Sequence, residues 1–131
     1  MILALADTSL IVDYIRGIDP GRLALTRLLT RRIVSTTVIV EAELWAGVDS
    51  PQAEEAVKKV LARFSAVHRY ERSDARAAGA LRRDLLRRRG DPSPREIDLL
   101  IAGAAVARGL AVLTANVRHF ADLPGVRVLR P

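Results

Sequence analysis

The chain contains no cysteine, which excludes disulfide bonds, thiolate metal sites and a cysteine nucleophile. The absence of cysteine is also typical of proteins in a reducing compartment. Histidine is nearly absent as well, with His68 and His119 as the only two in 131 residues. Any metal site in this protein must therefore be built mainly from oxygen ligands.

Long hydrophobic runs are missing too. A bilayer-spanning helix needs about 20 apolar residues, and the longest candidates here are interrupted by Glu41, Asp98 and Arg108. The first residues, MILALADTS, have no basic region and reach an acid after a short apolar run, unlike a signal peptide. These features predict a soluble, cytoplasmic protein with no membrane partner.

Aromatic residues make up only 4% of the chain, whereas 50% of the residues are hydrophobic and 27% are charged. This balance is typical of a folded globular protein. No linker, repeat or low-complexity tract divides the sequence, so we expect one domain over residues 1–131. Trp45 and Tyr14 fall within amphipathic helical patterns, and we expect them in the core or a dimer interface rather than stacked on bases.

Lysine is scarce, and arginine supplies nearly all of a net charge of +6. An excess of basic residues favours polyanionic partners such as nucleic acid, although an arginine-rich genomic composition would produce the same count. The densest run is LRRDLLRRRGD, residues 81–91. We interpret it first as a solvated helix face and second as a surface for RNA phosphates.

Short apolar runs alternate with amphipathic segments along the chain. They predict strands at residues 2–6, 32–38, 66–71, 110–116 and 125–131, and helices at 8–17, 19–32, 38–48, 50–64, 73–90 and 93–109. Ser50-Pro51 and Ser93-Pro94 are typical helix starts, and glycines 17, 90 and 109 are typical stops. The alternation predicts an α/β fold with a central, mainly parallel sheet covered by helices on both faces.

Two oxygen-bearing side chains follow predicted strands. Asp7 ends the first strand, and Asn116 comes just after Leu113 and Thr114 in the fourth. In open parallel sheets, functional groups gather beyond the carboxyl ends of the strands. Taken alone, Asp7 is better explained as a helix cap, and Asn116 as a turn residue.

Two further acids lie within apolar helical faces. Asp98 shares its face with Ile101, Ala102 and Ala105, and Glu43 shares its face with apolar and small residues. A buried carboxylate is costly unless it finds a cation. Either acid could form a buried ion pair with one of the many arginines, or both could contribute to a metal site.

Several carboxylates converging at one sheet edge would suit a hard divalent cation. Mg²⁺ and Mn²⁺ prefer oxygen ligands and are held by a few carboxylates together with waters and substrate phosphate. Asp7, Glu43 and Asp98 form such a set, with Asn116 as a neutral fourth member.

Four stretches together resemble a PIN domain, specifically the VapC-like ribonuclease toxins of prokaryotic type II toxin–antitoxin systems. They are LADTSLIVDYIRG, VEAELWAG, EIDLLIAGAAVARGL and VLTANVRHFADLPGVRVL, in this order over nearly the full length. The resemblance implies a three-layer α/β/α fold, Mg²⁺- or Mn²⁺-dependent endonucleolytic cleavage of RNA, a homodimer and a cognate VapB-like antitoxin.

The resemblance also assigns residues. It makes Asp7, Glu43 and Asp98 metal-binding catalytic acids, prefers Glu43 over Glu41, and places Asn116 at the fourth catalytic position. Ser9, Thr114 and His119 are secondary candidates. His119 stands where the family commonly has a further acid, which leaves open whether one metal ion binds or two. In the implied mechanism a metal-activated water cleaves the RNA, and no side chain acts as nucleophile.

Two other functions compete with this one. Asn116 and His119 are also compatible with a catalytically decayed PIN-like module that binds nucleic acid or protein. A phosphotransfer domain with Asp7 as nucleophile is disfavoured, because the second acid of a DxD motif is replaced by Ser9.

Overall fold

The computed structural model describes residues 1–90 and 95–131. The strands are β1 (Ala4–Ala6), β2 (Val34–Thr37), β3 (Val67–His68), β4 (Ala111–Leu113) and β5 (Val128–Leu129). The helices are α1 (Thr8–Arg16), α2 (Gly21–Thr30), α3 (Val38–Ala46), α4 (Pro51–Arg63), α5 (Arg72–Arg89) and α6 (Glu96–Arg108), with a 3₁₀ turn, η2, at Val117–His119.

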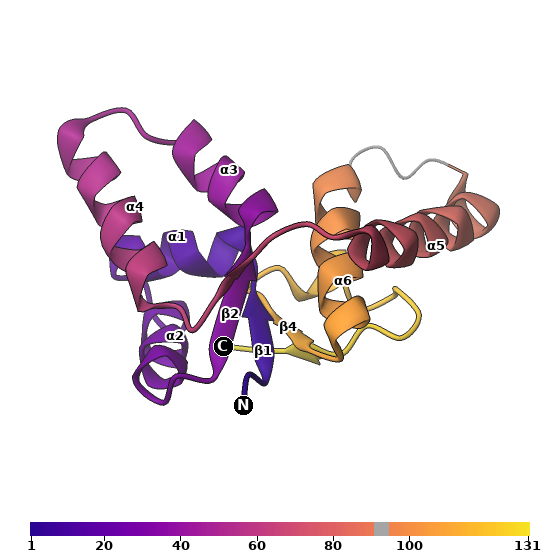
Figure 1. Cartoon of the computed structure of the whole chain (residues 1–131), viewed down its shortest axis with the longest axis horizontal. Coiled ribbons are helices and arrows are strands. Elements are labelled where there is room, and N and C mark those ends of the chain that lie inside the picture. The colour runs from indigo at the N-terminus through magenta and orange to yellow at the C-terminus, as the bar shows by residue number, and fades with distance from the viewer. Residues whose placement is uncertain (91–94) are drawn as a thin grey trace.

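The strands form one five-stranded sheet in the order β3-β2-β1-β4-β5, and every neighbouring pair is parallel. Helices α1 to α4 lie on one side of the sheet, and α5 and α6 lie on the other (Figure 1). This arrangement confirms the predicted α/β fold with helices on both faces. The chain order reverses between β1 and β4, which makes the carboxyl ends of these strands the switch point where ligands bind in such sheets.

Side-chain caps explain where several helices begin. Thr37 Oγ1 accepts hydrogen bonds from the backbone of α3 at 3.2 and 3.3 Å, and Ser50 Oγ accepts one from Ala53 N at 3.1 Å. Helices α1 and α6 end at Gly17 and Gly109, which have φ values of 71° and 68° that favour glycine. The predicted caps at Ser50, Gly17 and Gly109 are therefore confirmed.

Several predicted boundaries differ from those in the structure. Every strand is shorter than predicted; β1, for example, begins at Ala4 instead of Ile2, and β4 ends at Leu113 instead of Asn116. Helix α2 begins at Gly21 instead of residue 19, and α5 begins at Arg72, one residue before the predicted start. The predicted start of the last long helix at Ser93-Pro94 lies outside the described residues.

The core surrounds the central strand. All three residues of β1 are fully buried, and they pack with apolar side chains from helices on both faces of the sheet. Helices α5 and α6 approach so closely that a Cβ placed at Gly103 would lie 2.6 Å from Ala78 Cβ. Among residues 1–90 and 95–131, no helix is long and apolar enough to cross a membrane.

Candidate active site at the carboxyl edge of the sheet

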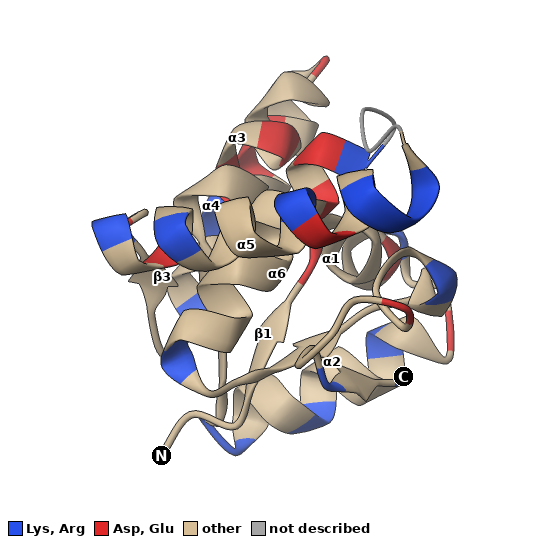
Figure 2. Cartoon of the chain, turned by 90° about the vertical axis from the view of Figure 1, so that its right-hand side faces the viewer, with Lys and Arg blue, Asp and Glu red and all other residues tan. Residues whose placement is uncertain are grey.

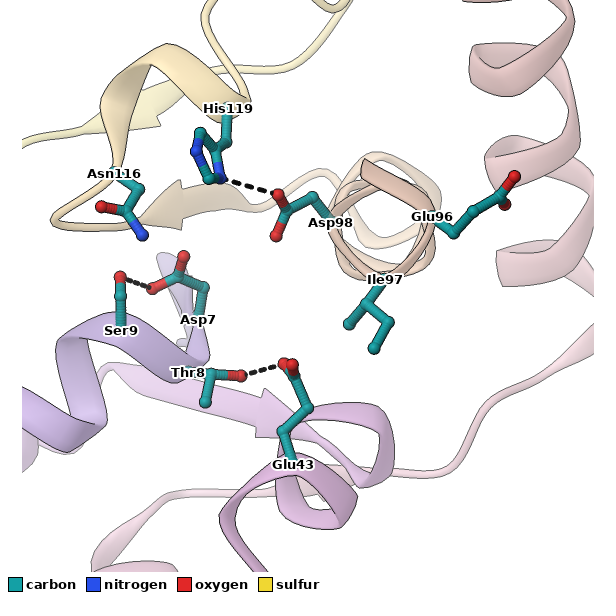
Figure 3. A pocket seen from close by; sticks show the side chains of 9 residues that line it. All are labelled: Asp7, Thr8, Ser9, Glu43, Glu96, Ile97, Asp98, Asn116 and His119. Atoms are coloured by element: carbon teal, nitrogen blue, oxygen red, sulfur yellow. Dashed lines mark hydrogen bonds and ion pairs between the residues drawn. The ribbon is translucent and has the colours of Figure 1, made fainter. Parts of the chain in front are cut away.

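A cavity of about 590 Å³ opens at the sheet edge where β1 and β4 end. The residues that line it come from segments far apart in the sequence, and most of their side chains surround one space, whereas Glu96 projects from the far side of α6 (Figure 3). They are Asp7, Thr8, Ser9, Glu43, Glu96, Ile97, Asp98, Asn116 and His119. The four predicted catalytic residues and two of the secondary candidates are thus brought together, while Thr114 lies beneath the cavity, fully buried.

Asp7 is the buried acid of this cavity, with only 3% of its surface exposed. Its Oδ1 accepts hydrogen bonds from Ser9 Oγ at 2.8 Å and Leu10 N at 3.3 Å, and its Oδ2 accepts one from Thr114 Oγ1 at 2.7 Å. Burial raises the pKa of the Asp7 carboxyl, the three hydrogen bonds oppose that shift, and the negative charge of Asp98 adds to it. Asp7 therefore caps α1 and also faces the cavity, so the two interpretations of this residue are compatible.

Glu43 faces the cavity from α3. The hydroxyl of Thr8 donates a hydrogen bond to Glu43 Oε1, which links the start of α1 to α3. Glu41, two residues earlier, instead accepts a hydrogen bond from Trp45 Nε1 at 2.9 Å and does not line the cavity. The choice of Glu43 over Glu41 thus agrees with the placement of the two side chains.

Asp98 lies in the first turn of α6, and its side chain is 22% exposed. Its Oδ2 is 2.9 Å from His119 Nδ1, across the mouth of the cavity (Figure 3). Among the described residues, neither Asp98 nor Glu43 forms an ion pair with an arginine. The alternative of a buried arginine pair is therefore not found for either acid.

Asn116 follows β4 and reaches the cavity from the strand next to Asp7. Its backbone N–H donates to Thr114 Oγ1 at 2.9 Å, and that same hydroxyl donates to Asp7 Oδ2. Thr114 thus connects the ends of the two central strands and orients Asp7.

Other acids near this edge are neutralised. Glu96, which lines the cavity, pairs with Arg82 at 3.0 Å. Asp122 lies outside the cavity and pairs with Arg95 at 2.8 Å and Arg89 at 3.1 Å. A hydrogen bond from Arg95 and the charges of both arginines lower the pKa of the Asp122 carboxyl, against a smaller opposing effect of burial.

The donor set fits a hard cation held by few protein ligands. Asp7, Glu43, Asp98 and Asn116 offer carboxylate and amide oxygens, the ligands that Mg²⁺ and Mn²⁺ prefer. Within the described part of the chain, no three His, Asp or Glu side chains are close enough to hold one ion together. This spacing suits an ion held by one or two carboxylates and several waters.

Glu96 is a cavity residue that was not predicted from the sequence. It stands two residues before Asp98, and the helical spacing alone puts the two on different sides of α6. Glu96 lines the cavity because the opening extends around the first turn of that helix.

Comparisons with known proteins agree with this architecture. The family model described as PIN domain matches residues 4–126. The chain is 32% identical over 126 residues to "Ribonuclease VapC19" of Mycobacterium tuberculosis, covering 94% of this chain and 96% of that protein.

Solved structures resemble the whole fold. One is VapBC2 from Rickettsia felis bound to a DNA fragment from its promoter, with a TM-score of 0.85, 23% identity and 99% coverage of both chains. Another is DNA-bound VapBC from Salmonella typhimurium, with a TM-score of 0.81, 26% identity and coverage of 99% and 98%. The chain therefore belongs to the PIN-domain family and, within it, to the VapC-like ribonuclease toxins.

Proposed function

We propose that this protein is the toxin of a type II toxin–antitoxin system and cleaves RNA endonucleolytically with Mg²⁺ or Mn²⁺ in the cytoplasm. The observation that supports it best is the meeting of three acids from separate elements, Asp7 after β1, Glu43 on α3 and Asp98 on α6, in one cavity. None of the three has an arginine or lysine partner among the described residues.

In this proposal Asp7 and Asp98 would hold the metal ion directly, and Glu43 would hold it through a water molecule. When bound, the ion activates water and offsets the charge that develops on the phosphodiester. Glu43 also orients the attacking water as a hydrogen-bond acceptor. Asn116 offers a neutral oxygen at the same opening.

The hydroxyl groups beneath these acids have a positioning role. Thr114 and Ser9 hold the two oxygens of Asp7 in place, and Thr8 holds Glu43. His119 orients Asp98 through Nδ1. A cleft arranged in this way needs no side-chain nucleophile, because the water supplies the attacking oxygen.

The proposal extends to the assembly. A single PIN domain over residues 1–131 is supported by the family match to residues 4–126. A VapB-like antitoxin as partner is supported by relatives that were solved as VapBC complexes. A homodimer is proposed from the family resemblance.

Metal-dependent cleavage of total RNA tests the function. We expect degradation by the antitoxin-free protein in Mg²⁺ or Mn²⁺, and none in excess EDTA. Asp98→Asn should lose cleavage, whereas Asp84→Asn should retain it because Asp84 is a surface residue paired with Arg88. Absence of cleavage by the wild-type protein in either metal would favour the decayed binding module suggested by Asn116 and His119.

A further inference from the structure

A second cavity of about 270 Å³ adjoins the candidate active site. It is lined by Ala115, Asn116, Val117, Arg118, His119 and Arg130, and we call it the arginine pocket. Asn116 and His119 line both this pocket and the larger acidic cavity, so they form a shared wall. Any molecule that extends from the active site past these two residues reaches the arginine pocket.

The sheet explains why Arg130 lies there. Strand β5 pairs in parallel with β4, with Leu129 opposite Leu113, and Thr114 N donates to Leu129 O at 3.3 Å. Arg130 therefore leaves the sheet at the same carboxyl edge as Thr114 and Asn116. Arg118 comes from the other wall, in the turn η2 that follows Asn116.

The charge of the arginine pocket is not neutralised by the residues that line it. No acid is among them, and neither Arg118 nor Arg130 forms an ion pair within the described residues. Three arginines of α5 are engaged instead: Arg82 pairs with Glu96, Arg88 with Asp84, and Arg89 with Asp122. In Figure 2, basic segments of α5 accordingly lie beside acidic ones.

We propose that the arginine pocket binds a phosphate of the RNA strand that neighbours the cleaved phosphate. This inference rests on the proposed function and adds a substrate contact to it. The acidic cavity attracts a metal ion and the pocket attracts an anion, and a phosphodiester chain presents anions at regular intervals past both. Guanidinium groups bind phosphate oxygens in a bidentate manner, and two of them converge here.

An RNA strand fits this position better than an acidic peptide does. The pocket shares its wall with the cavity in which cleavage is proposed, so it lies directly beside an RNA strand held there. A contact of this kind fixes the register of the strand without reading bases. It is therefore expected to act on affinity for RNA of any sequence.

Fluorescence anisotropy in EDTA, which prevents cleavage, tests the pocket. The probe is a short fluorescein-labelled single-stranded RNA of mixed sequence, titrated over a series of KCl concentrations. We expect Arg118→Gln and Arg130→Gln each to weaken binding by roughly three- to tenfold, the effect of losing one exposed charge-assisted contact. The plot of the logarithm of the association constant against the logarithm of the salt concentration has a negative slope. Its magnitude should fall by about 0.7, the value for one phosphate contact on a single strand.

Two sets of controls separate this contact from general charge and from misfolding. Arg76→Gln removes the same charge near the start of α5, close to the Asp74–Arg108 ion pair and away from the pocket. Its affinity for the RNA should be within about twofold of the wild-type value. Arg118→Lys and Arg130→Lys keep the charge and should recover most of the salt slope. All variants should melt at the wild-type temperature, because both pocket arginines are exposed.

The proposed phosphate contact is contradicted if Arg118→Gln and Arg130→Gln bind this RNA with the affinity and salt slope of Arg76→Gln. If the two variants bind RNA normally but lose affinity for an antitoxin, the proposal is also wrong. The pocket would then bind an acidic protein segment. Cleavage of total RNA by the wild-type protein is scored separately. Weakened RNA binding by both variants, beside an inactive wild-type protein, supports the pocket and contradicts the nuclease proposal.

Discussion

Two buried aspartates, Asp7 and Asp74, are held in opposite ways in this protein. Asp74 is 1% exposed at the junction of α5 and α6, where Arg108 forms an ion pair with its Oδ1 and Glu71 N donates to its Oδ2 at 2.7 Å. Asp7 is 3% exposed at the edge of the sheet, where hydroxyl and amide groups donate to it and no cation pairs with it in the described residues.

The difference separates an acid that supports the fold from an acid that costs stability. Arg108 compensates the charge of Asp74, and it also donates to the carbonyl oxygens of Ala104 and Arg69, so the pair joins α6 to α5 and to the residue that follows β3. The raised pKa of Asp7 means that its ionised form is disfavoured in the folded protein. A buried acid without a cationic partner indicates a functional role, and for Asp7 the proposed role is the binding of a metal ion.

The largest effect is expected for Asp7→Asn on RNA cleavage. The amide is a poor ligand for a hard cation and supplies no negative charge, so Mg²⁺-dependent cleavage should fall by roughly a hundredfold or more. The fold should remain, because the amide oxygen can still accept the hydrogen bonds from Ser9 and Leu10, and its NH2 group can donate to the Thr114 hydroxyl. Cleavage rates on total RNA measure this effect, with Asp84→Asn as the control, and a rate near that of wild type would contradict the role of Asp7.

The next largest effect is expected for Asp74→Asn on stability. This substitution leaves the partly buried Arg108 guanidinium without its charged partner and should lower the free energy of unfolding by about 2 to 4 kcal/mol. Denaturant unfolding of the EDTA-treated protein measures the loss. A change as small as that of Asp84→Asn would show that the ion pair at the α5–α6 junction is not structural.

The packing of that junction can be tested without changing charge. Gly103→Ala places a methyl group against Ala78, where a Cβ would be 2.6 Å from both Ala78 Cβ and Ala78 N. Because one of these is a backbone atom, α5 and α6 must move apart, and we expect a loss of about 1 to 3 kcal/mol. Gly79→Ala is the matched control, since nothing lies within 4 Å of a Cβ there. Equal stability of the two variants would contradict the close approach of the helices.

Asp7→Asn should have the opposite effect on the stability of the metal-free protein. A carboxyl with a raised pKa binds its proton more tightly in the folded state, so stability falls as pH rises from its ordinary value of 3.8 through the raised value. At neutral pH the amide removes this cost, and the EDTA-treated variant should be at least as stable as wild type. A melting temperature clearly below that of wild type would contradict this expectation.

Asp122→Asn should have a smaller effect on stability, opposite in sign to that of Asp7→Asn. The pKa of this carboxyl is lowered, so its ion pairs stabilise the fold above pH 3.8 and lose that contribution as pH falls through the lowered value. Asp122→Asn should therefore be less stable than wild type at neutral pH, and the difference should shrink on acidification. Melting curves over a pH series would contradict this if the difference were constant.

Much of the fold follows from local features of the sequence. Apolar runs and capping residues determine the structure of the few residues around them. Examples are the buried strands at residues 4–6 and 111–113 and the caps Ser50, Gly17 and Gly109. The carboxyl-edge position of Asp7 and Asn116 follows from the strands that precede them. Strand lengths do not follow, because a strand ends where tertiary hydrogen bonds end, as at Thr37, which caps α3.

The partners of each charge depend on contacts that local patterns do not encode. The sequence left Asp98 with many possible arginines, whereas the fold places His119 beside it and directs arginines to Glu96, Asp122 and Asp74. The dense arginine run, which lies mostly on α5, was the RNA-binding surface that the sequence suggested. The arginines beside the cavity, Arg118 and Arg130, meet only because β5 pairs with β4. The catalytic roles of the cavity residues stay predictions.

Titration of Mn²⁺ into EDTA-stripped protein, followed by the melting temperature, tests the central claim that Asp7 is kept for a metal ion. Binding to the folded state alone raises the melting temperature as the free metal concentration exceeds the dissociation constant. We predict a rise for wild type and for Asp84→Asn, and none for Asp7→Asn, although all three start from folded protein. An equal rise for Asp7→Asn and wild type, or no rise for wild type at millimolar Mn²⁺, would contradict the account.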